Sequence, residues 1–200
     1  ATAQRVVVVS RDLPLLEGGN GAVLLAGLSL AADIAVAEVL GGGPSVLDQI
    51  LTAAPGTLLI GADDNAGSAG AGAVLIGDRG ATVTLTARQN RSLPVVVRRQ
   101  DGTRHDYGDP RLQREVGARA TLARLGLPTT TEVVGLAGMA AAQLPCGTAS
   151  RVAASPKASA GSLMRVLIAA IEHGDSGTVL GVEQSSVTAA YLSAGRTRIH

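Results

Sequence analysis

Aromatic residues are nearly absent from this chain, which has two Tyr, no Trp and no Phe among its 200 residues. Charge of either sign is also scarce, since 17 basic residues face 16 acidic ones for a net charge of +1. Nucleic-acid-binding proteins rely on a basic surface, and those that bind single strands add aromatic rings on which bases stack. The composition therefore argues against a nucleic-acid partner.

Cysteine and long apolar runs are equally scarce. Cys146 is the only cysteine, so an intrachain disulfide is excluded. No apolar run reaches the roughly 20 residues that a membrane span needs. The three histidines, His105, His173 and His200, lack the spacing of metal ligands. We therefore expect a cytoplasmic protein without a membrane contact or a bound metal.

Aliphatic and small residues supply what the aromatics do not, because 46% of the chain is hydrophobic and 26 residues are Gly. Continuous β-branched runs predict buried strands, and apolar residues at helical spacing predict helices between them. The predicted strands cover 5–10, 33–40, 57–62, 72–77, 81–87, 131–136, 177–183 and 186–192. The predicted helices cover 22–30, 46–54, 111–125 and 160–173, with a helical turn at 138–144.

This alternation predicts an α/β fold of two βα halves, with mixed, largely parallel sheets covered by helices. We expect a single domain over 1–200, with an N-terminal half (1–87), a polar connection (88–108) and a C-terminal half (109–200). Residues 88–114 and 145–157 are expected to be loop-like or irregular.

Local signals also mark the helix ends. Ser45 is expected to cap the helix at 46–54, with Asp48 in its first turn. Ser159 is expected to cap the helix at 160–173, which Gly174 closes.

Few side chains suggest chemistry by themselves. Cys146 lies between Pro145 and Gly147 without a neighbouring His, so a packed thiol is favoured over a nucleophile. The glycine-rich stretch 65–77 leads into a strand rather than a helix, which disfavours a phosphate-binding loop. Asp63 and Asp64 are expected to belong to a solvated surface.

Four blocks nevertheless resemble the thiolase superfamily, in particular ketoacyl synthase III and the archaeal-type hydroxymethylglutaryl-CoA synthases. They are GGGPSVLDQILTAAPGTLLIGADD (41–64), the glycine-rich strand ending GAGAVLIGD (65–78), VRRQDGTRHDYGDPRLQREVG (97–117) and SPKASAGSLMRVLIAAIEHGDSGTVLGVE (155–183). Their order matches the family along nearly the whole chain, which is shorter than a full family member.

The resemblance implies a catalytic Cys at the N-terminus of a buried helix, together with a His and an Asn or second His. None of the three is present at the matching positions. The nucleophile block holds Gly42, Gly43, Pro44 and Ser45; the His block is 133–139; and the third block holds Ser155, Lys157, Ser159 and Ser162.

A family member without these residues is expected to be a catalytically degenerate accessory subunit of an acyl-CoA thiolase or synthase, with no cofactor and with a CoA thioester as its possible ligand. The resemblance implies a thiolase-fold dimer partner, homo or hetero, and a small zinc-ribbon/OB-fold protein as a further partner. The implied dimer contact is the strand at 33–39, with Asp33, Ile34, Val36 and Glu38.

Two alternatives stay open. The chain could be a noncanonical acyltransferase, or a hydroxymethylglutaryl-CoA-synthase-like enzyme, that uses Ser45 or Cys146 on acyl-CoA thioesters. It could instead be a non-catalytic CoA-binding module in which Arg98, Arg99 and Arg104 meet the phosphates.

Overall fold

A computed structural model describes residues 2–11, 13, 19–64, 69–90, 96–98, 104–106, 118–183 and 186–195. The helices are α1 (Gly21–Gly27), α2 (Gly43–Thr52), α4 (Ala118–Leu125), α5 (Ala160–His173) and the short 3-10 helix η1 (Ala141–Gln143). The strands are β1 (Arg5–Ser10), β2 (Ala35–Leu40), β3 (Thr57–Asp63), β4 (Gly70–Leu75), β5 (Thr82–Asn90), β6 (Val96–Arg98), β7 (Arg104–Asp106), β8 (Val133–Ala137), β9 (Thr148–Ser155), β10 (Gly177–Val182) and β11 (Ser186–Ser193).

Two mixed sheets form the framework, as the alternation predicts. The first has the order β2-β1-β3-β4, with β4 alone antiparallel, and the second has the order β5-β11-β10-β8-β9, with β8, β9 and β10 parallel. Strands β6 and β7 pair only with each other within the described chain.

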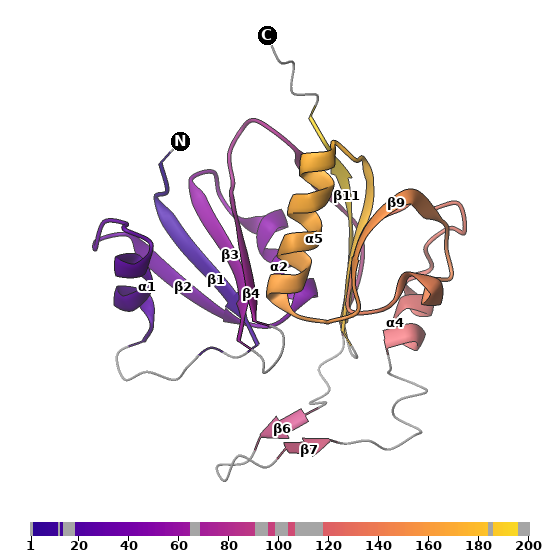
Figure 1. Ribbon diagram of the computed structural model, residues 1–200, viewed down its shortest axis with the longest axis horizontal. Helices are drawn as coiled ribbons and strands as arrows, with labels where there is room; N and C mark the ends of the chain where they lie inside the picture. Colours follow the sequence, from indigo (N-terminus) through magenta and orange to yellow (C-terminus); the bar gives the residue numbers. More distant parts are fainter. Residues whose placement is uncertain are drawn as a thin grey trace.

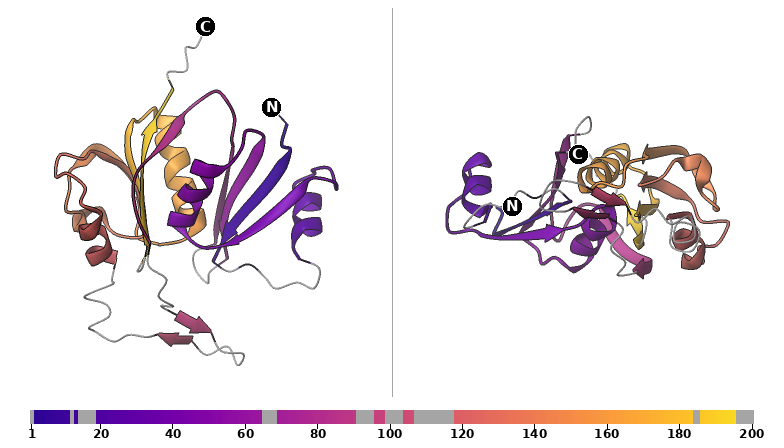
Figure 2. Two further views of the ribbon diagram at one scale, coloured as in Figure 1. Left: turned by 180° about the vertical axis from the view of Figure 1, so that it is seen from behind. Right: turned by 90° about the horizontal axis from the view of Figure 1, so that it is seen from below.

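The two sheets enclose a central layer made of α2 and α5 (Figure 1). Helix α1 covers the outer face of the first sheet and α4 the outer face of the second (Figures 1 and 2). Alternate side chains of β1 pack on opposite faces of the sheet. Val7 and Val9 belong to the central core, whereas Val6 and Val8 belong to the cluster beneath α1. This strand is buried on both sides, which explains its unbroken β-branched sequence.

The two halves repeat one topology. In each half, two parallel strands precede a buried helix, which is followed by a third parallel strand and an antiparallel one: β1-β2-α2-β3-β4 and then β8-β9-α5-β10-β11. Each buried helix also contacts the sheet of the other half. The halves are thus interlocked through their buried helices.

The start of α2 differs from the prediction. The helix begins at Gly43 with Gly42 as its N-cap, so the assignment of Ser45 as the cap is wrong. Pro44 fits the first turn because its φ is already helical and its missing N–H is not needed there. Ser45 therefore lies inside the first turn and Asp48 in the second.

Both segments expected to be irregular contain strands, namely the end of β5, β6 and β7 within 88–114 and β9 within 145–157. Residues 148–155 form β9, which pairs in parallel with β8 at the edge of the second sheet. Strand β5 continues to Asn90 because its whole length pairs with β11, with a register shift opposite Ala189 and Ala190. In both segments, pairing with a neighbouring strand outweighs a composition that is poor in large apolar residues.

The remaining predictions agree closely with the structure. Ser159 caps α5 through its hydroxyl, which accepts a hydrogen bond from the Ser162 amide at 3.1 Å, and Gly174 ends the helix with φ 72°. The predicted helix at 111–125 is described only from Ala118 onward, as α4. Among the described helices, none is long and apolar enough to cross a membrane.

Candidate functional site

The N-termini of the two buried helices meet between the sheets, each against a glycine of a strand from the other half. A Cβ on Gly61 of β3 would lie 2.7 Å from the carbonyl oxygen of Ala160, the first residue of α5. A Cβ on Gly181 of β10 would lie 2.8 Å from the carbonyl carbon of Gly43, the first residue of α2. Glycine is required at both positions because the helix backbone takes the place of a side chain.

The N-terminus of α2 is covered by a carboxylate. A Cβ on the N-cap residue Gly42 would collide with Oε1 of Glu183 and would lie 2.6 Å from the carbonyl oxygen of Ala158. Glu183 directly follows β10, so its side chain reaches α2 from the other half of the chain. The position where a nucleophile would project is therefore filled.

The N-terminus of α5 also receives a carboxylate, that of Asp63 at the end of β3. Its Oδ2 accepts a hydrogen bond from the Gly161 amide at 2.7 Å, and its Oδ1 accepts one from the Arg11 amide at 3.1 Å. Asp63 is only 5% exposed, so its assignment to a solvated surface is wrong. Negative charge at a helix N-terminus is stabilised by the unpaired amides and the helix dipole, which explains how this carboxylate is accommodated.

Arg11 links the two carboxylates. Its Nη1 lies 3.8 Å from Oε1 of Glu183, while its backbone amide holds Asp63. Burial raises the pKa of Glu183; the positive charge of Arg11 opposes that rise, and the negative charge of Asp63 adds to it. Asp63, Glu183 and Arg11 form what we name the carboxylate pair site.

The segments that the resemblance assigns to catalytic blocks converge here. Gly138, next to the end of β8, donates its amide to the carbonyl of Ser155 at 2.9 Å, and a Cβ on Gly138 would collide with the carbonyl of Val182. Ala158 lies against Gly42. The fold therefore brings together the three segments in which the resemblance predicts a catalytic Cys, His and Asn.

The two candidate nucleophiles lie in different places. Ser45 is in the first turn of α2, where its hydroxyl occupies the space beside Gly41. Cys146 lies between η1 and β9 and packs at the edge of the cluster beneath α4. Burial raises the pKa of the Cys146 thiol, which lowers its thiolate fraction at neutral pH.

Two of the three predicted CoA-contacting arginines, Arg98 and Arg104, lie on the paired strands β6 and β7. The backbones of Arg98 and Arg104 are register partners there. Arg99 lies outside the described residues.

The predicted interface residues lie on or just before β2, the edge strand of the first sheet. Ile34 and Val36 pack into the cluster beneath α1. Glu38 accepts hydrogen bonds from the backbone amide and Nδ2 of Asn20, both at 2.7 Å, and Asp33 is exposed. What β2 leaves open to another chain is therefore mainly its backbone edge.

Sequence reasoning missed the carboxylate pair site. The signal that could have found it is the position of the two acidic residues. Strand β3 ends in Asp63, and β10, the equivalent strand of the second half, is followed directly by Glu183. In the described residues, no group of three or more His, Cys, Asp or Glu side chains could hold a metal ion.

Solved structures of condensing enzymes share this architecture. The chain aligns with AbyA1, a tetronic acid condensing enzyme, at a TM-score of 0.60 and 11% identity, covering 96% of this chain and 79% of that one. It aligns with 3-oxoacyl-[acyl-carrier-protein] synthase III from Aquifex aeolicus VF5 at a TM-score of 0.59 and 14% identity, covering 96% and 77%. The chain has the thiolase-like fold of condensing enzymes. No protein-family model and no curated protein sequence matches it.

Proposed function

We propose that this chain is a cytoplasmic, non-catalytic thiolase-fold subunit that assembles with a catalytic thiolase or synthase acting on acyl-CoA. The observation that carries the proposal is the Glu183 carboxylate at the α2 N-terminus, which fills the space of any side chain at position 42. A thiol nucleophile at such a helix end depends on the amides and dipole to stabilise its thiolate. Here a glycine and a neighbouring carboxylate take that place.

The position of β2 at the edge of the first sheet supports assembly, since no other strand in the described part of the chain pairs with its outer side. An edge strand exposes a row of unpaired amide and carbonyl groups that another strand can bind. Leu40, at the end of β2, is 74% exposed, which adds apolar surface at the same edge. The proposed partner is a second thiolase-fold chain, and a small zinc-ribbon/OB-fold protein is a further component of the proposed assembly.

The decisive experiment is co-expression with the thiolase-fold enzymes of the same organism, followed by size-exclusion chromatography with light scattering and an acyl-transfer assay. We expect a hetero-complex whose activity falls when this chain is omitted. Isolation only as a monomer, without co-purification of any such enzyme, would overturn the proposal.

Matched variants test the edge. Leu40→Lys places a charge at the edge of β2 and should weaken assembly. Leu85→Lys is the control, because Leu85 is 48% exposed and lies on β5 of the second sheet rather than on the sheet that β2 borders. Equal complex formation by both variants would exclude β2 as the contact.

Acyl transfer by this chain alone would instead establish a noncanonical acyltransferase. Intact-mass measurement after incubation with an acyl-CoA would then show an adduct, and Ser45→Ala and Cys146→Ala would identify the residue that carries it. Because the Cys146 pKa is raised, we expect no adduct there at neutral pH.

CoA binding is a second candidate function, with Arg98 and Arg104 on the paired strands β6 and β7. The candidate rests on the residue type, since arginine guanidinium groups bind phosphate oxygens. Calorimetric titration with CoA should show salt-dependent binding that weakens in Arg98→Gln and Arg104→Gln, and absence of binding at low salt would exclude it.

A further inference from the structure

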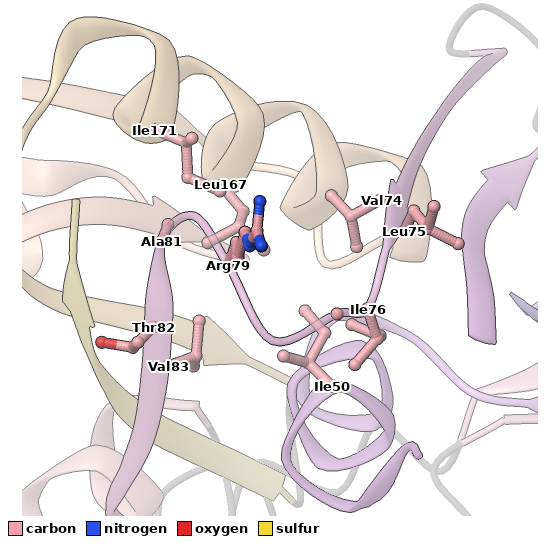
Figure 3. Close-up of a pocket in the computed structure, with 11 residues that line it drawn as sticks. Ile50, Val74, Leu75, Ile76, Arg79, Ala81, Thr82, Val83, Leu167 and Ile171 are labelled. Carbon is pink, nitrogen blue, oxygen red and sulfur yellow. The ribbon is translucent and has the colours of Figure 1, made fainter. Parts of the chain in front are cut away.

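A hollow of about 470 Å³ opens at the opposite ends of the buried helices from the carboxylate pair site (Figure 3). Ile50 of α2 and Ile171 of α5 line it, together with the end of β4 and the start of β5. At 1.5 Å per residue, these positions lie about 10 Å along α2 and about 17 Å along α5 from the helix N-termini. The hollow is thus separate from the site discussed above.

The walls of the hollow are largely aliphatic. Val74, Val83 and Leu167 contribute side chains besides the two isoleucines. Leu75, also in the lining, is 39% exposed and so presents apolar surface to water. A concave aliphatic surface of this size is within the range of small-molecule sites and favours an apolar guest.

One cationic side chain, that of Arg79, lines this hollow. Arg79 lies on the link between β4 and β5, and Figure 3 shows its guanidinium among the aliphatic side chains. The guanidinium makes no ion pair or hydrogen bond with other described residues, although the carboxylate of Asp78 belongs to the adjoining hollow that Arg79 also lines. An unpaired guanidinium beside an aliphatic surface complements a molecule with an alkyl chain and a single negative head group.

We propose that this hollow binds a single-chain amphiphile, with the alkyl chain against Ile50, Leu167 and Ile171 and the anionic head group at Arg79. The aliphatic side chains of the walls favour a hydrocarbon chain. Arg79 determines the sign of the head-group charge. This inference does not depend on the proposed accessory function, because it uses neither the α2 N-terminus nor the β2 edge.

The test is a titration of the full chain with hexanoate, octanoate and decanoate, followed by methyl NMR. We expect shifts at the methyl groups of Ile50 and Ile171, with affinity increasing by up to about fourfold for each methylene that becomes buried. 1-Nonanol, which has the same nine-carbon alkyl chain without the charge, should bind about threefold more weakly than decanoate.

Variants separate the two parts of the site. Arg79→Gln should remove the preference for decanoate over 1-nonanol, whereas Arg151→Gln, which changes an exposed arginine on β9, should keep it. Gly77→Leu should weaken both ligands by reducing the hollow; a Cβ there meets open space and Gly77 has no positive φ, so the fold should tolerate the change.

Absence of binding by decanoate, binding without shifts at Ile50 and Ile171, or an undiminished carboxylate preference in Arg79→Gln would each overturn the proposal. Failure of the amphiphile arm would leave the acyl-transfer and co-purification results unaffected, so the two proposals fail separately.

Discussion

The N-termini of α2 and α5 are equivalent positions in the two halves, yet they are completed differently. The α5 end has its own cap in Ser159 and also receives Asp63, which is hydrogen-bonded to the Gly161 amide. The α2 end has a glycine cap without a side chain and receives Glu183, whose pKa is raised by burial. The same topology therefore provides one fully bonded helix end and one that is covered by a poorly solvated carboxylate.

This difference indicates which of the two helix ends can change its contacts and its protonation. Asp63 is held by two backbone amides, so moving it would break both hydrogen bonds. Glu183 has the Arg11 guanidinium at 3.8 Å as its charged partner. We therefore expect the α5 end to be important mainly for stability and the α2 end to respond to pH.

The largest expected effect comes from the glycines that admit the helix ends. Gly61→Ala and Gly181→Ala should each lower the free energy of unfolding by about 2–3 kcal/mol, because the new methyl group meets helix backbone that has no room to move. Urea unfolding measures the loss. Gly27→Ala is the control, since nothing lies near its Cβ position and alanine favours a helix by roughly 0.5–1 kcal/mol over glycine. A tolerated alanine at only one of the two strand positions would show that the halves are packed unequally.

Removal of the Asp63 carboxylate should have the next largest effect. Asp63→Ala leaves the amides of Gly161 and Arg11 without their acceptor, which should cost about 1–3 kcal/mol in denaturant unfolding. The exposed neighbour Asp64 serves as the control, and Asp64→Ala should change stability by less than about 0.5 kcal/mol. Equal effects at the two positions would argue that Asp63 does not stabilise the α5 end.

Unlike the substitutions above, Glu183→Gln should raise the free energy of unfolding at neutral pH. The folded-state pKa of Glu183 lies above its ordinary value of 4.5, so the folded protein binds more protons than the unfolded chain between those two pKa values. Stability contributed by this group is complete below pH 4.5 and is lost as the pH rises through the raised pKa. Glutamine removes the cost of burying a charge, so the variant should gain stability relative to the native chain as pH increases.

Urea unfolding at pH 4 and pH 7 tests that sign. Glu172→Gln, an exposed change on α5, is the matched control and should show no such pH-dependent gain. A loss of stability in Glu183→Gln that grows with pH would contradict the assignment of burial as the dominant influence on this carboxyl group.

The smallest expected effect concerns the contact of α2 with the second sheet. Arg88 Nη1 lies 3.3 Å from Asp48 Oδ1, which also accepts a hydrogen bond from the Thr188 hydroxyl at 3.2 Å. Because the Arg88 side chain is 47% exposed, Arg88→Gln should cost only about 0.5 kcal/mol, and less at high salt. A loss as large as that of Asp63→Ala would mean that α2 is held chiefly by this ion pair.

Much of the fold could be predicted because its signals are local. Helix α5 has a serine cap, apolar residues at helical spacing and a terminal glycine, all within sixteen residues of one another. Strand β9 could not be predicted in this way, because its alanines and serines have little strand preference. Its conformation depends on pairing with β8 in the folded sheet.

The candidate site could be predicted only as a set of missing residues. The glycines before α2 marked the helix, but nothing adjacent to them indicates Glu183, which is more than a hundred residues away in the chain. Asp63 was expected at the surface because it precedes a loop. Burial of both carboxylates arises only when the two sheets enclose the buried helices.

The amino-acid sequence by itself determined the alternation of strands and helices and the start and end of helix α5, because caps and β-branched runs are properties of adjacent positions. Only the tertiary structure decided that a carboxylate from one half covers the helix end of the other and that an aliphatic hollow opens beside Arg79. Both features join segments distant in sequence, and their contacts exist only once the two halves pack together.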